Sequence, residues 1–511
     1  MILEGSYPYV FGGVSSWTHQ YIQAMKEHEF VLWCIGAQSK DKDKFKYKLP
    51  DNVVEVHQVF LDDALRMNSQ GRMHHRNLKE EELHALQTLI SGENTDWSIL
   101  FEMFQNNRIN PLSMLMGYQF LEVVKNACHE KYPYIAFADY FHTVRSMMLP
   151  ELYLLTQQVP QADIYHATAT GYSGILGSLG KWKYNKPFIL TEHGIYTRER
   201  EEELLRAKWV LPSLRKQWIN LFYNFSNCAY TYADYVTSLF ERASQIQKGL
   251  GCDENKLRVI GNGVHYERFV NIPAPQTQDW VNIGAVVRIA KIKDIKTMIY
   301  AFTELKMRID KVRLYILGDV DDPEYKEECV QLIEMLGVKD IIFTGPVNVV
   351  EYMEKFDFTI LTSISEGQPL SVLESFAAAR PAVTTDVGCC RELIYGRTQD
   401  ELGQAGFLVP PMHREELLAA TIGIVCVIIV HQRQIALRGQ CAGFLIRDSD
   451  GILLHDFRQN GLLHRGSIAL IGKSRSGHAD AQHRRQQQCA KSLKLHPNHP
   501  PCRKLRPQRP K

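Results

Sequence analysis

Two carboxylates stand eight residues apart in SEGQPLSVLE (365–374), where a predicted strand gives way to a predicted helix. Glu366 lies in the loop, and Glu374 lies inside the helix that Pro369 opens and Pro381 ends. The amino end of a helix has free N–H groups and partial positive charge, so it can bind phosphate. Carboxylates repel phosphate but accept hydrogen bonds from hydroxyl groups. The pattern therefore fits a nucleotide-sugar, with one carboxylate on ribose and one on the sugar. A helix with an acidic cap and an acidic face residue has the same pattern.

The second half of the chain predicts the sheet that would position this loop. Apolar strands alternate there with amphipathic helices, which is typical of a parallel sheet covered on both faces. In such doubly wound sheets, ligands bind at the carboxyl ends of the strands. The strands are predicted at 281–287, 312–318, 340–345, 358–363, 381–386 and 406–410.

The first half repeats this α/β rhythm around a helical insertion. Residues 60–160 are rich in Met, Leu, Glu and Lys and carry few strand signals. We therefore expect two doubly wound, Rossmann-like domains, at 1–270 and 281–420, with the site in the cleft between them. The proline-containing stretch 271–280 is the predicted linker. Strands are predicted at 2–3, 30–36, 162–174, 186–194, 235–240 and 257–265.

Charge divides the chain unevenly. The whole chain carries a net charge of +2, but residues 431–511 contain 16 Lys and Arg, four Asp and no Glu. The remainder is therefore acidic, at about −10, which argues against nucleic acid as a partner. Residues 421–511 read as an atypical basic tail, either disordered or non-native, and a basic arm for nucleic acid or membrane is the alternative. The apolar run 419–430 is too short to span a bilayer.

Scattered cysteines and the sequence of the first residues indicate a cytoplasmic protein. The eleven cysteines form no CxxC pair, and reduced thiols are the simplest interpretation. The opening MILEGSYPY has neither a basic region nor a long apolar run, so no signal peptide is expected.

Several motifs, in order, resemble a known family. The stretch ISEGQPLSVLESFAAARPAVTTDVG, followed by CRELI, resembles the E-x7-E signature of retaining GT-B glycosyltransferases of the GT4 type. EGSYPYVFGGVSSWTHQ and TEHGIYTRERE resemble, more particularly, the PelF family of cytosolic glycosyltransferases in Pel exopolysaccharide synthesis. The resemblance covers about residues 1–420. It implies a GT-B fold and a metal-independent transfer of a hexose, glucose in this family, from a UDP-sugar to a growing polysaccharide.

The resemblance also implies roles for matching residues. Glu366 would hold donor-sugar hydroxyls near the anomeric carbon, and Glu374 would bind the ribose. Arg288 and Lys293, in VVRIAKIKDIKT (286–297), would clamp the diphosphate, because fixed cations stabilise the charge that develops on the leaving group. Other donor-side residues would be Gly367, Gln368, Pro369, Leu370, Ser371, Gly12 and Gly13, and His193 and His166 would face the sugar or the acceptor.

Some features stay open or depart from the family. Gly12 and Gly13 let a backbone approach phosphate, but a tight turn needs such a pair as well. Asp319, Asp321 and Asp322 fit a surface turn better than a metal site. Arg380 stands where the family usually has glycine, and the pattern of the final helices is lost after residue 420.

No cofactor is expected besides the UDP-sugar substrate. The partners expected are the polysaccharide acceptor and an inner-membrane synthase complex, at whose membrane the protein would be peripheral. A non-catalytic nucleotide-sugar-binding subunit of such a complex is the alternative function.

Overall fold

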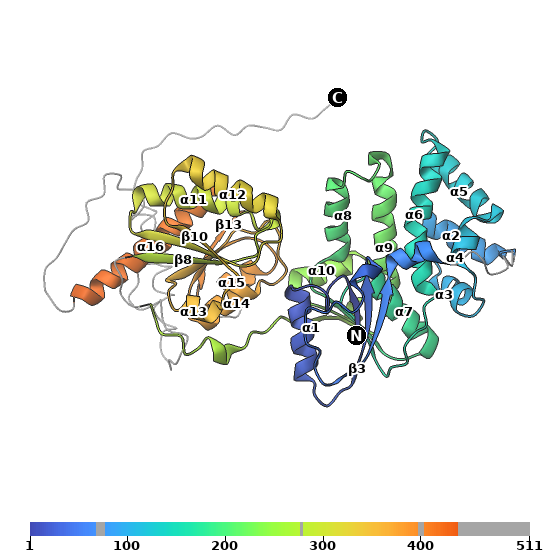
Figure 1. The fold of residues 1–511 in the computed structure, drawn as a ribbon, viewed down its shortest axis with the longest axis horizontal. Coiled ribbons are helices and arrows are strands. Elements are labelled where there is room, and N and C mark those ends of the chain that lie inside the picture. The colour runs from blue at the N-terminus through green and yellow to red at the C-terminus, as the bar shows by residue number, and fades with distance from the viewer. Residues whose placement is uncertain (68–76, 276–279, 397–402, 438–511) are drawn as a thin grey trace, which may run out of the picture. The chain divides into compact units, whose positions relative to one another are not determined.

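Two parallel β-sheets with helices on their faces form the framework of the chain (Figure 1). This computed structural model describes residues 1–67, 77–275, 280–396 and 403–437. They belong to the first of two units, Met1–Gly443, whereas the second unit, Phe444–Lys511, lies outside the described residues. Every strand pair among the described residues is parallel, so the predicted fold class is confirmed.

The first domain contains a seven-stranded sheet in the order β3-β2-β1-β4-β5-β6-β7. The order reverses between β1 and β4, and such a reversal is where ligands bind in doubly wound sheets. The strands are β1 (Ile2–Glu4), β2 (Phe30–Gly36), β3 (Val53–Phe60), β4 (Tyr165–Ala167), β5 (Phe188–Glu192), β6 (Tyr235–Ser238) and β7 (Leu257–Val259).

Strand β3 is the one element of this sheet that the sequence did not reveal. Its residues VVEVHQVF place charged and polar side chains between apolar ones, and the first six are not buried. That pattern suits an edge strand with one neighbour, which β3 is. A search for apolar runs misses such a strand.

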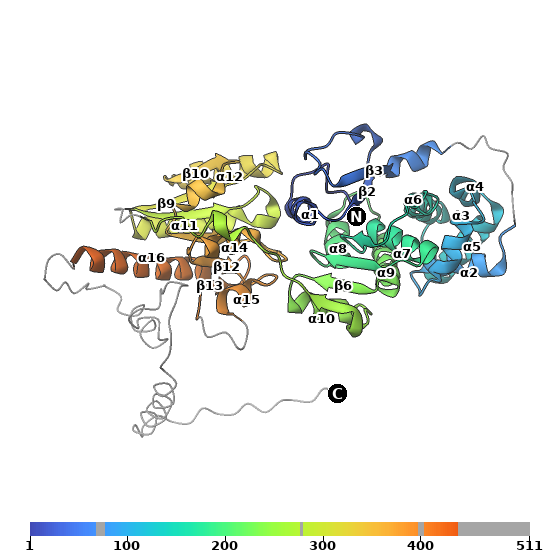
Figure 2. The ribbon, with the colours of Figure 1, turned by 90° about the horizontal axis from the view of Figure 1, so that it is seen from below.

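In the described part of the insertion between β3 and β4 lie five α-helices, as the composition of residues 60–160 predicts. They are α2 (Glu80–Ser91), α3 (Trp97–Gln105), α4 (Pro111–Leu115), α5 (Tyr118–Lys131) and α6 (Phe137–Leu155). Figure 2 shows them gathered together beside α7 (Tyr172–Tyr184) and α9 (Arg215–Tyr232), against which α2, α3 and α6 pack. The other helices of this domain are α1 (Gly13–Ala24), α8 (Tyr196–Arg206) and α10 (Glu241–Gly249).

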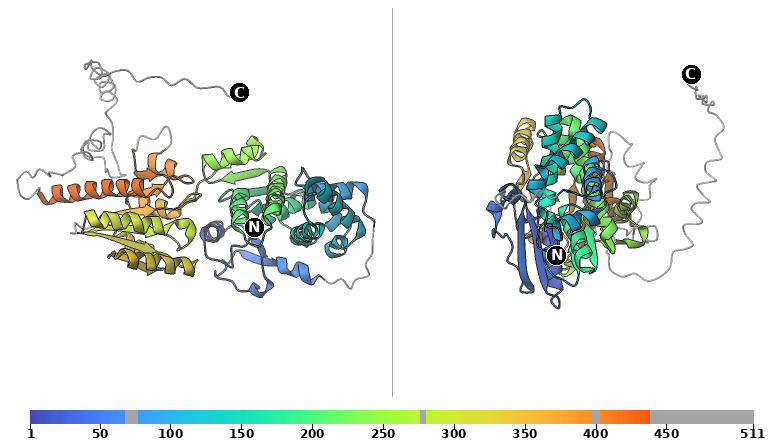
Figure 3. Two further views of the ribbon diagram at one scale, coloured as in Figure 1. Left: turned by 90° about the horizontal axis from the view of Figure 1, so that it is seen from above. Right: turned by 90° about the vertical axis from the view of Figure 1, so that its right-hand side faces the viewer.

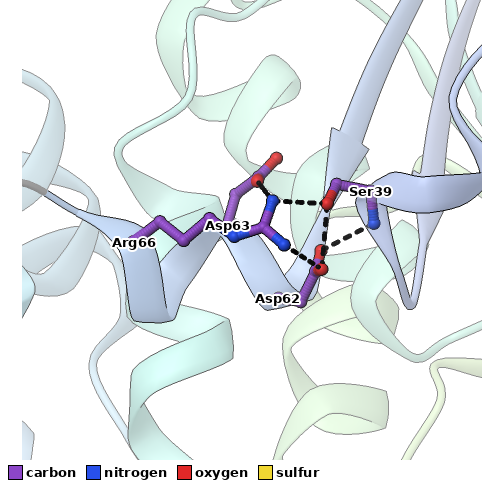
Figure 4. Close-up of polar contacts among 4 residues, drawn as sticks. All are labelled: Ser39, Asp62, Asp63 and Arg66. Atoms are coloured by element: carbon purple, nitrogen blue, oxygen red, sulfur yellow. Dashed lines mark hydrogen bonds and ion pairs between the residues drawn. The ribbon is translucent and has the colours of Figure 1, made fainter.

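A polar cluster fixes the chain where it leaves β3 (Figure 4). Asp62 accepts hydrogen bonds from the Ser39 backbone N–H, at 2.8 Å, and from the Ser39 hydroxyl, at 2.9 Å. Arg66 donates to the Ser39 hydroxyl and forms ion pairs with Asp62 and Asp63. These bonds hold the short 3-10 helix Leu61–Arg66 against the loop after β2.

The second domain contains a six-stranded sheet in the order β10-β9-β8-β11-β12-β13. Its order reverses between β8 and β11. The strands are β8 (Val281–Val286), β9 (Val312–Leu317), β10 (Ile341–Gly345), β11 (Phe358–Leu361), β12 (Ala382–Thr385) and β13 (Gly406–Val409). The helices are α11 (Ile295–Arg308), α12 (Pro323–Leu336), α13 (Val349–Met353), α14 (Leu370–Ala377), α15 (Cys390–Tyr395) and α16 (Arg414–Leu437).

Helix α16 continues past residue 420, where we expected the ordered domain to end. It runs to Leu437 and packs along α11, as Figure 3 shows. Ile422, Ile424 and Val425 are buried in the core of this domain, so the apolar run 419–430 is largely a core helix. The predicted tail beyond residue 437 lies outside the described residues. Within the described chain, no helix combines the length and apolarity needed to cross a membrane.

Candidate active site

The loops that follow β8 and β11 meet at the point where the strand order of the second sheet reverses. Lys293 lies in the loop after β8, in a short 3-10 helix, Lys291–Lys293. Glu366 lies in the loop after β11, just before α14. Adjacent parallel strands with crossovers on opposite sides leave a crevice between such loops. The sheet therefore brings together two residues that stand 73 positions apart.

Lys293 and Glu366 form a mostly buried ion pair. The Lys293 Nζ donates to the Glu366 Oε1 at 2.5 Å, and the two side chains are 14% and 13% exposed. The Ser363 hydroxyl donates to the same carboxylate oxygen at 2.6 Å. The Thr362 hydroxyl donates to the Lys293 carbonyl at 2.9 Å and so holds the cation's backbone in place. Neither hydroxyl was singled out by the sequence.

This ion pair explains how a carboxylate can lie next to a predicted phosphate-binding site. That Glu366 binds hydroxyls of a donor sugar stays a prediction, and in the chain without ligand its partners are Lys293 and the Ser363 hydroxyl. The ammonium group compensates the carboxylate charge and removes most of its repulsion toward an anion. An anionic ligand at Lys293 would compete only with the Glu366 carboxylate for the ammonium group. The Ser363 hydroxyl would keep donating to Glu366.

Arg288, the second predicted cation, lies in the loop just after β8 and forms an ion pair with Asp321 from the loop after β9. Its side chain is 51% exposed, so solvent screens the pair and exchange of Asp321 for another anion costs little. Asp322 caps helix α12 by accepting from the Tyr325 N–H at 2.9 Å. The acidic turn therefore has local partners.

Glu374 lies inside α14. No hydrogen bond or ion pair holds its carboxylate among the described residues. Burial raises the pKa of this carboxyl, and the charge of Arg268 acts in the opposite direction. Glu374 is thus half-buried, and its contact with ribose stays a prediction.

The residues between the two glutamates connect the loop to the first domain. Gln368 accepts a hydrogen bond from the Asn262 N–H at 2.5 Å through its Oε1 atom. A Cβ on Gly367 would lie 2.5 Å from the His193 carbonyl oxygen, so only glycine fits there. Pro369 is buried and caps α14 instead of opening it, because its ψ of 116° is extended. Leu370 and Ser371 are half-buried in the first turn.

The two predicted histidines lie against aromatic rings of α1. His193 follows β5 directly, and its ring meets that of Trp17 edge to face at 4.6 Å. Its Nε2 atom is buried without a partner, and burial lowers its pKa to about 4. His166 was expected at a strand end, but it lies inside β4, bonded through Nε2 to the Thr191 hydroxyl at 2.8 Å. Desolvation lowers its pKa to about 3.

Gly12 and Gly13 begin helix α1 at the edge of the first sheet. Gly13 is the first helical residue, and Gly12 has an extended backbone with φ of 171°. No atom lies within 4 Å of a Cβ built on either one. Neither a strained turn nor crowding by the protein explains the pair, and their contact with a donor stays a prediction.

Gly388 is a site residue that sequence reasoning missed. Its φ is +55°, and a Cβ there would lie 2.1 Å from the Gly367 carbonyl oxygen and 2.4 Å from that of Glu366. The next N–H, of Cys389, donates to the Gly367 carbonyl at 3.0 Å. Gly388 thus supports the loop that carries Glu366. The signal was present in TTDVGCC, where a glycine follows a predicted strand.

A second missed group is the buried Glu192 at the end of β5. It accepts from the Tyr230 hydroxyl at 2.7 Å and from the Gln247 amide at 2.8 Å. Desolvation raises the pKa of this carboxyl, while these bonds act to lower it. Glu192 fixes the strand end from which His193 projects.

Two protein-family models match parts of this chain. A family model described as glycosyl transferases group 1 matches residues 279–426, which include the whole Lys293–Glu366 site. Residues 279–426 are thus similar to the group 1 glycosyl transferases. A second model, described as a domain of unknown function (DUF3492), matches residues 1–255.

Curated glycosyltransferases are similar to this chain over part of their length. An α-monoglucosyldiacylglycerol synthase of Streptococcus pneumoniae is 27% identical over 242 residues, 44% of this chain and 52% of the relative. An MMP α-(1→4)-mannosyltransferase of Mycolicibacterium hassiacum is 23% identical over 265 residues, 50% of this chain and 60% of the relative. The chain thus spans between half and two thirds of these relatives.

A solved structure shares the fold. Anabaena Alr3699/HepE, crystallised with UDP and glucose, matches with a TM-score of 0.50 and 14% identity, over 84% of this chain and 90% of HepE. At this identity the similarity concerns the fold, which is GT-B: two Rossmann-like α/β domains with parallel sheets.

Proposed function

We propose that this protein is a retaining hexosyltransferase that moves glucose from UDP-glucose to a growing exopolysaccharide, in the manner of the PelF family. The observation that carries the proposal is the Lys293–Glu366 pair at the reversal of the second sheet, inside the group 1 glycosyl transferase region. The UDP and glucose in HepE and the glycosyltransferase names of the curated relatives support this reaction class.

The arrangement of charges supports each residue's part in this reaction. Lys293 would exchange Glu366 for the diphosphate of the donor, and Arg288 would leave the exposed Asp321 to bind the same group. As the glycosidic bond breaks, both cations would stabilise the charge that develops on UDP. Glu366, freed from Lys293 and still bonded to Ser363, would accept from hydroxyls of the sugar.

Release of UDP from UDP-glucose, with and without added polysaccharide, tests the proposal. Loss of one cation that acts mainly on the leaving group reduces such rates by about 100- to 1,000-fold, so we expect that loss for Lys293→Ala. We expect a similar loss for Glu366→Ala. Lys296→Ala is the matched control. Lys296 stands three positions after Lys293 in the sequence, and its loss breaks only an exposed ion pair with Glu328.

The results separate the enzyme from a binding subunit. Turnover by wild type and by Lys296→Ala, but not by the two site variants, would support the transferase. Binding of UDP-glucose without turnover under all acceptor conditions would contradict it. Retention is tested separately by the anomeric configuration of the product in NMR spectra.

A further inference from the structure

An exposed apolar and basic segment joins α8 to α9 in the first domain. We call residues 205–216, LRAKWVLPSLRK, the α8–α9 tip. Three of its large apolar side chains face solvent: Leu205 is 54% exposed, Trp209 69% and Leu211 44%. Single exposed apolar residues are common, but three within seven positions form a patch.

The α8–α9 tip is also the place where positive charge is left uncompensated. It contains Arg206, Lys208, Arg215 and Lys216 and no acidic residue. None of these four forms an ion pair with any other described residue. Earlier in α8, by contrast, Arg198 and Arg200 pair with Glu202 and Glu203. The positive charge of the tip stands out further because residues 1–430 are acidic.

Buried neighbours hold these exposed side chains in place. Leu204, Val210 and Leu214 alternate with them and are at most 4% exposed, in the main core of the first domain. The Trp209 ring meets the Trp218 ring edge to face, at 5.3 Å between centroids. The outward position of Trp209 is therefore built into the packing.

The topology places the α8–α9 tip on the side of the sheet where the site residues lie. Helix α9 leads back to β6, which is parallel to β5, so α9 begins at the carboxyl edge of the sheet. Helix α8 starts just after His193, at that same edge, and the two helices pack side by side (Figure 1). The tip thus projects beyond the edge that carries His193.

We propose that the α8–α9 tip docks this protein on an anionic lipid bilayer surface. Tryptophan and leucine would enter the headgroup region, while the exposed Arg206, Lys208 and Lys216 contact lipid phosphates. Charge complementarity favours this occupant over a protein surface, because the tip has four cations and no hydrogen-bonding carboxylate or amide side chain. Docking would hold the first domain at the membrane. This goes beyond the proposed function and does not depend on it.

Cosedimentation of the full chain with vesicles tests the docking. We expect binding to vesicles of mixed phosphatidylglycerol and phosphatidylcholine, little binding to pure phosphatidylcholine, and weakening by salt. Each basic residue near an anionic surface contributes about fivefold in affinity, so Arg206→Ala with Lys208→Ala should weaken binding by about 25-fold. Trp209→Ser should also weaken vesicle binding, by a factor that does not change with the salt concentration.

A matched control uses the same chemistry in the second domain. Met335→Ser with Lys339→Ala removes an exposed apolar and an exposed basic side chain there, and should bind vesicles as wild type does. The tip variants should release UDP in vesicle-free solution at the wild-type rate, which separates this proposal from the proposed function. Equal vesicle binding by wild type and the tip variants would overturn the docking, and so would equal binding to neutral vesicles. Loss of polysaccharide synthesis in cells with vesicle binding unchanged would assign the tip to a protein partner and overturn it too.

Discussion

At the scale of single residues, the site is built from charges that neutralise one another until a ligand arrives. Lys293 and Glu366 are both mostly buried, and burial of either charge alone would be costly. Each therefore stabilises the other in the free protein. A donor with both phosphate and hydroxyl groups would offer new partners to both residues at once, phosphate to Lys293 and hydroxyls to Glu366. In the proposed function, such a pair would bind a nucleotide-sugar without leaving a bare buried charge.

The buried histidines make a prediction about pH. His193 has a pKa of about 4 in the folded chain, compared with about 6.5 when unfolded, so the unfolded chain binds more protons between these values. Its contribution to stability is complete above pH 6.5 and decreases as the pH falls toward 4. Between pH 7 and pH 5 the loss is about 1–2 kcal/mol.

Urea unfolding of wild type and His193→Gln at pH 7 and pH 5 measures this effect. The variant should lose less stability than wild type over that interval, by about 1–2 kcal/mol. A titration of the His193 ring by NMR with a midpoint near 6.5 would contradict the burial argument.

At the scale of elements, the loop that carries Glu366 depends on its neighbours in the second domain. Gly388 leaves the space that the carbonyls of Glu366 and Gly367 occupy, and the Cys389 N–H binds one of them. The position of the Lys293–Glu366 ion pair therefore depends on the conformation of the turn after β12.

Gly388→Ala should displace the Glu366 loop and reduce UDP release by at least about tenfold, because displacement of a catalytic group by about 1 Å has large effects on rate. Gly337→Ala is the matched control. Gly337 has a similar φ, +60°, but no atom lies within 4 Å of its Cβ position. Both variants should lose stability through backbone strain, and only Gly388→Ala should lose activity. Equal activity in the two variants would contradict the role of Gly388.

Helix α14 ends in a way that the sequence suggested only in part. The family usually has glycine at position 380, but the residue with a left-handed backbone is Ala379, with φ of +55°. Its N–H donates to the Phe376 carbonyl, and that of Arg380 donates to the Ser375 carbonyl, which is the Schellman arrangement. The buried Arg380 side chain then donates to the carbonyls of Met353, Ala378 and Pro273.

Ala379→Gly should therefore stabilise the chain. Relief of the left-handed strain is worth about 1–2 kcal/mol, and the greater freedom of glycine in the unfolded chain cancels about half of it. Thermal unfolding should show a small increase in Tm. No change or a decrease would indicate that the helix end carries no strain.

At the scale of the whole molecule, the sequence predicts the strands and helices of the two sheets better than the side-chain contacts of the site. Apolar strands between amphipathic helices define both sheets, because buried parallel strands must be apolar. Strand β3 and the continuation of α16 were missed, since an edge strand is polar and a helix buried on several sides lacks a regular stripe. The Lys293–Glu366 bond and the Gly388 contact could not be predicted, because they depend on which loops the strand order brings together.

Calorimetric titration with UDP tests most directly the claim that Lys293 exchanges Glu366 for the diphosphate. Lys293→Ala should bind UDP at least about tenfold more weakly than wild type, because a charge-assisted bond to phosphate is lost. Glu366→Ala should bind UDP as tightly as wild type or more tightly, since the carboxylate competes for Lys293. Equal weakening of UDP binding in both variants, or no change in either, would contradict this account.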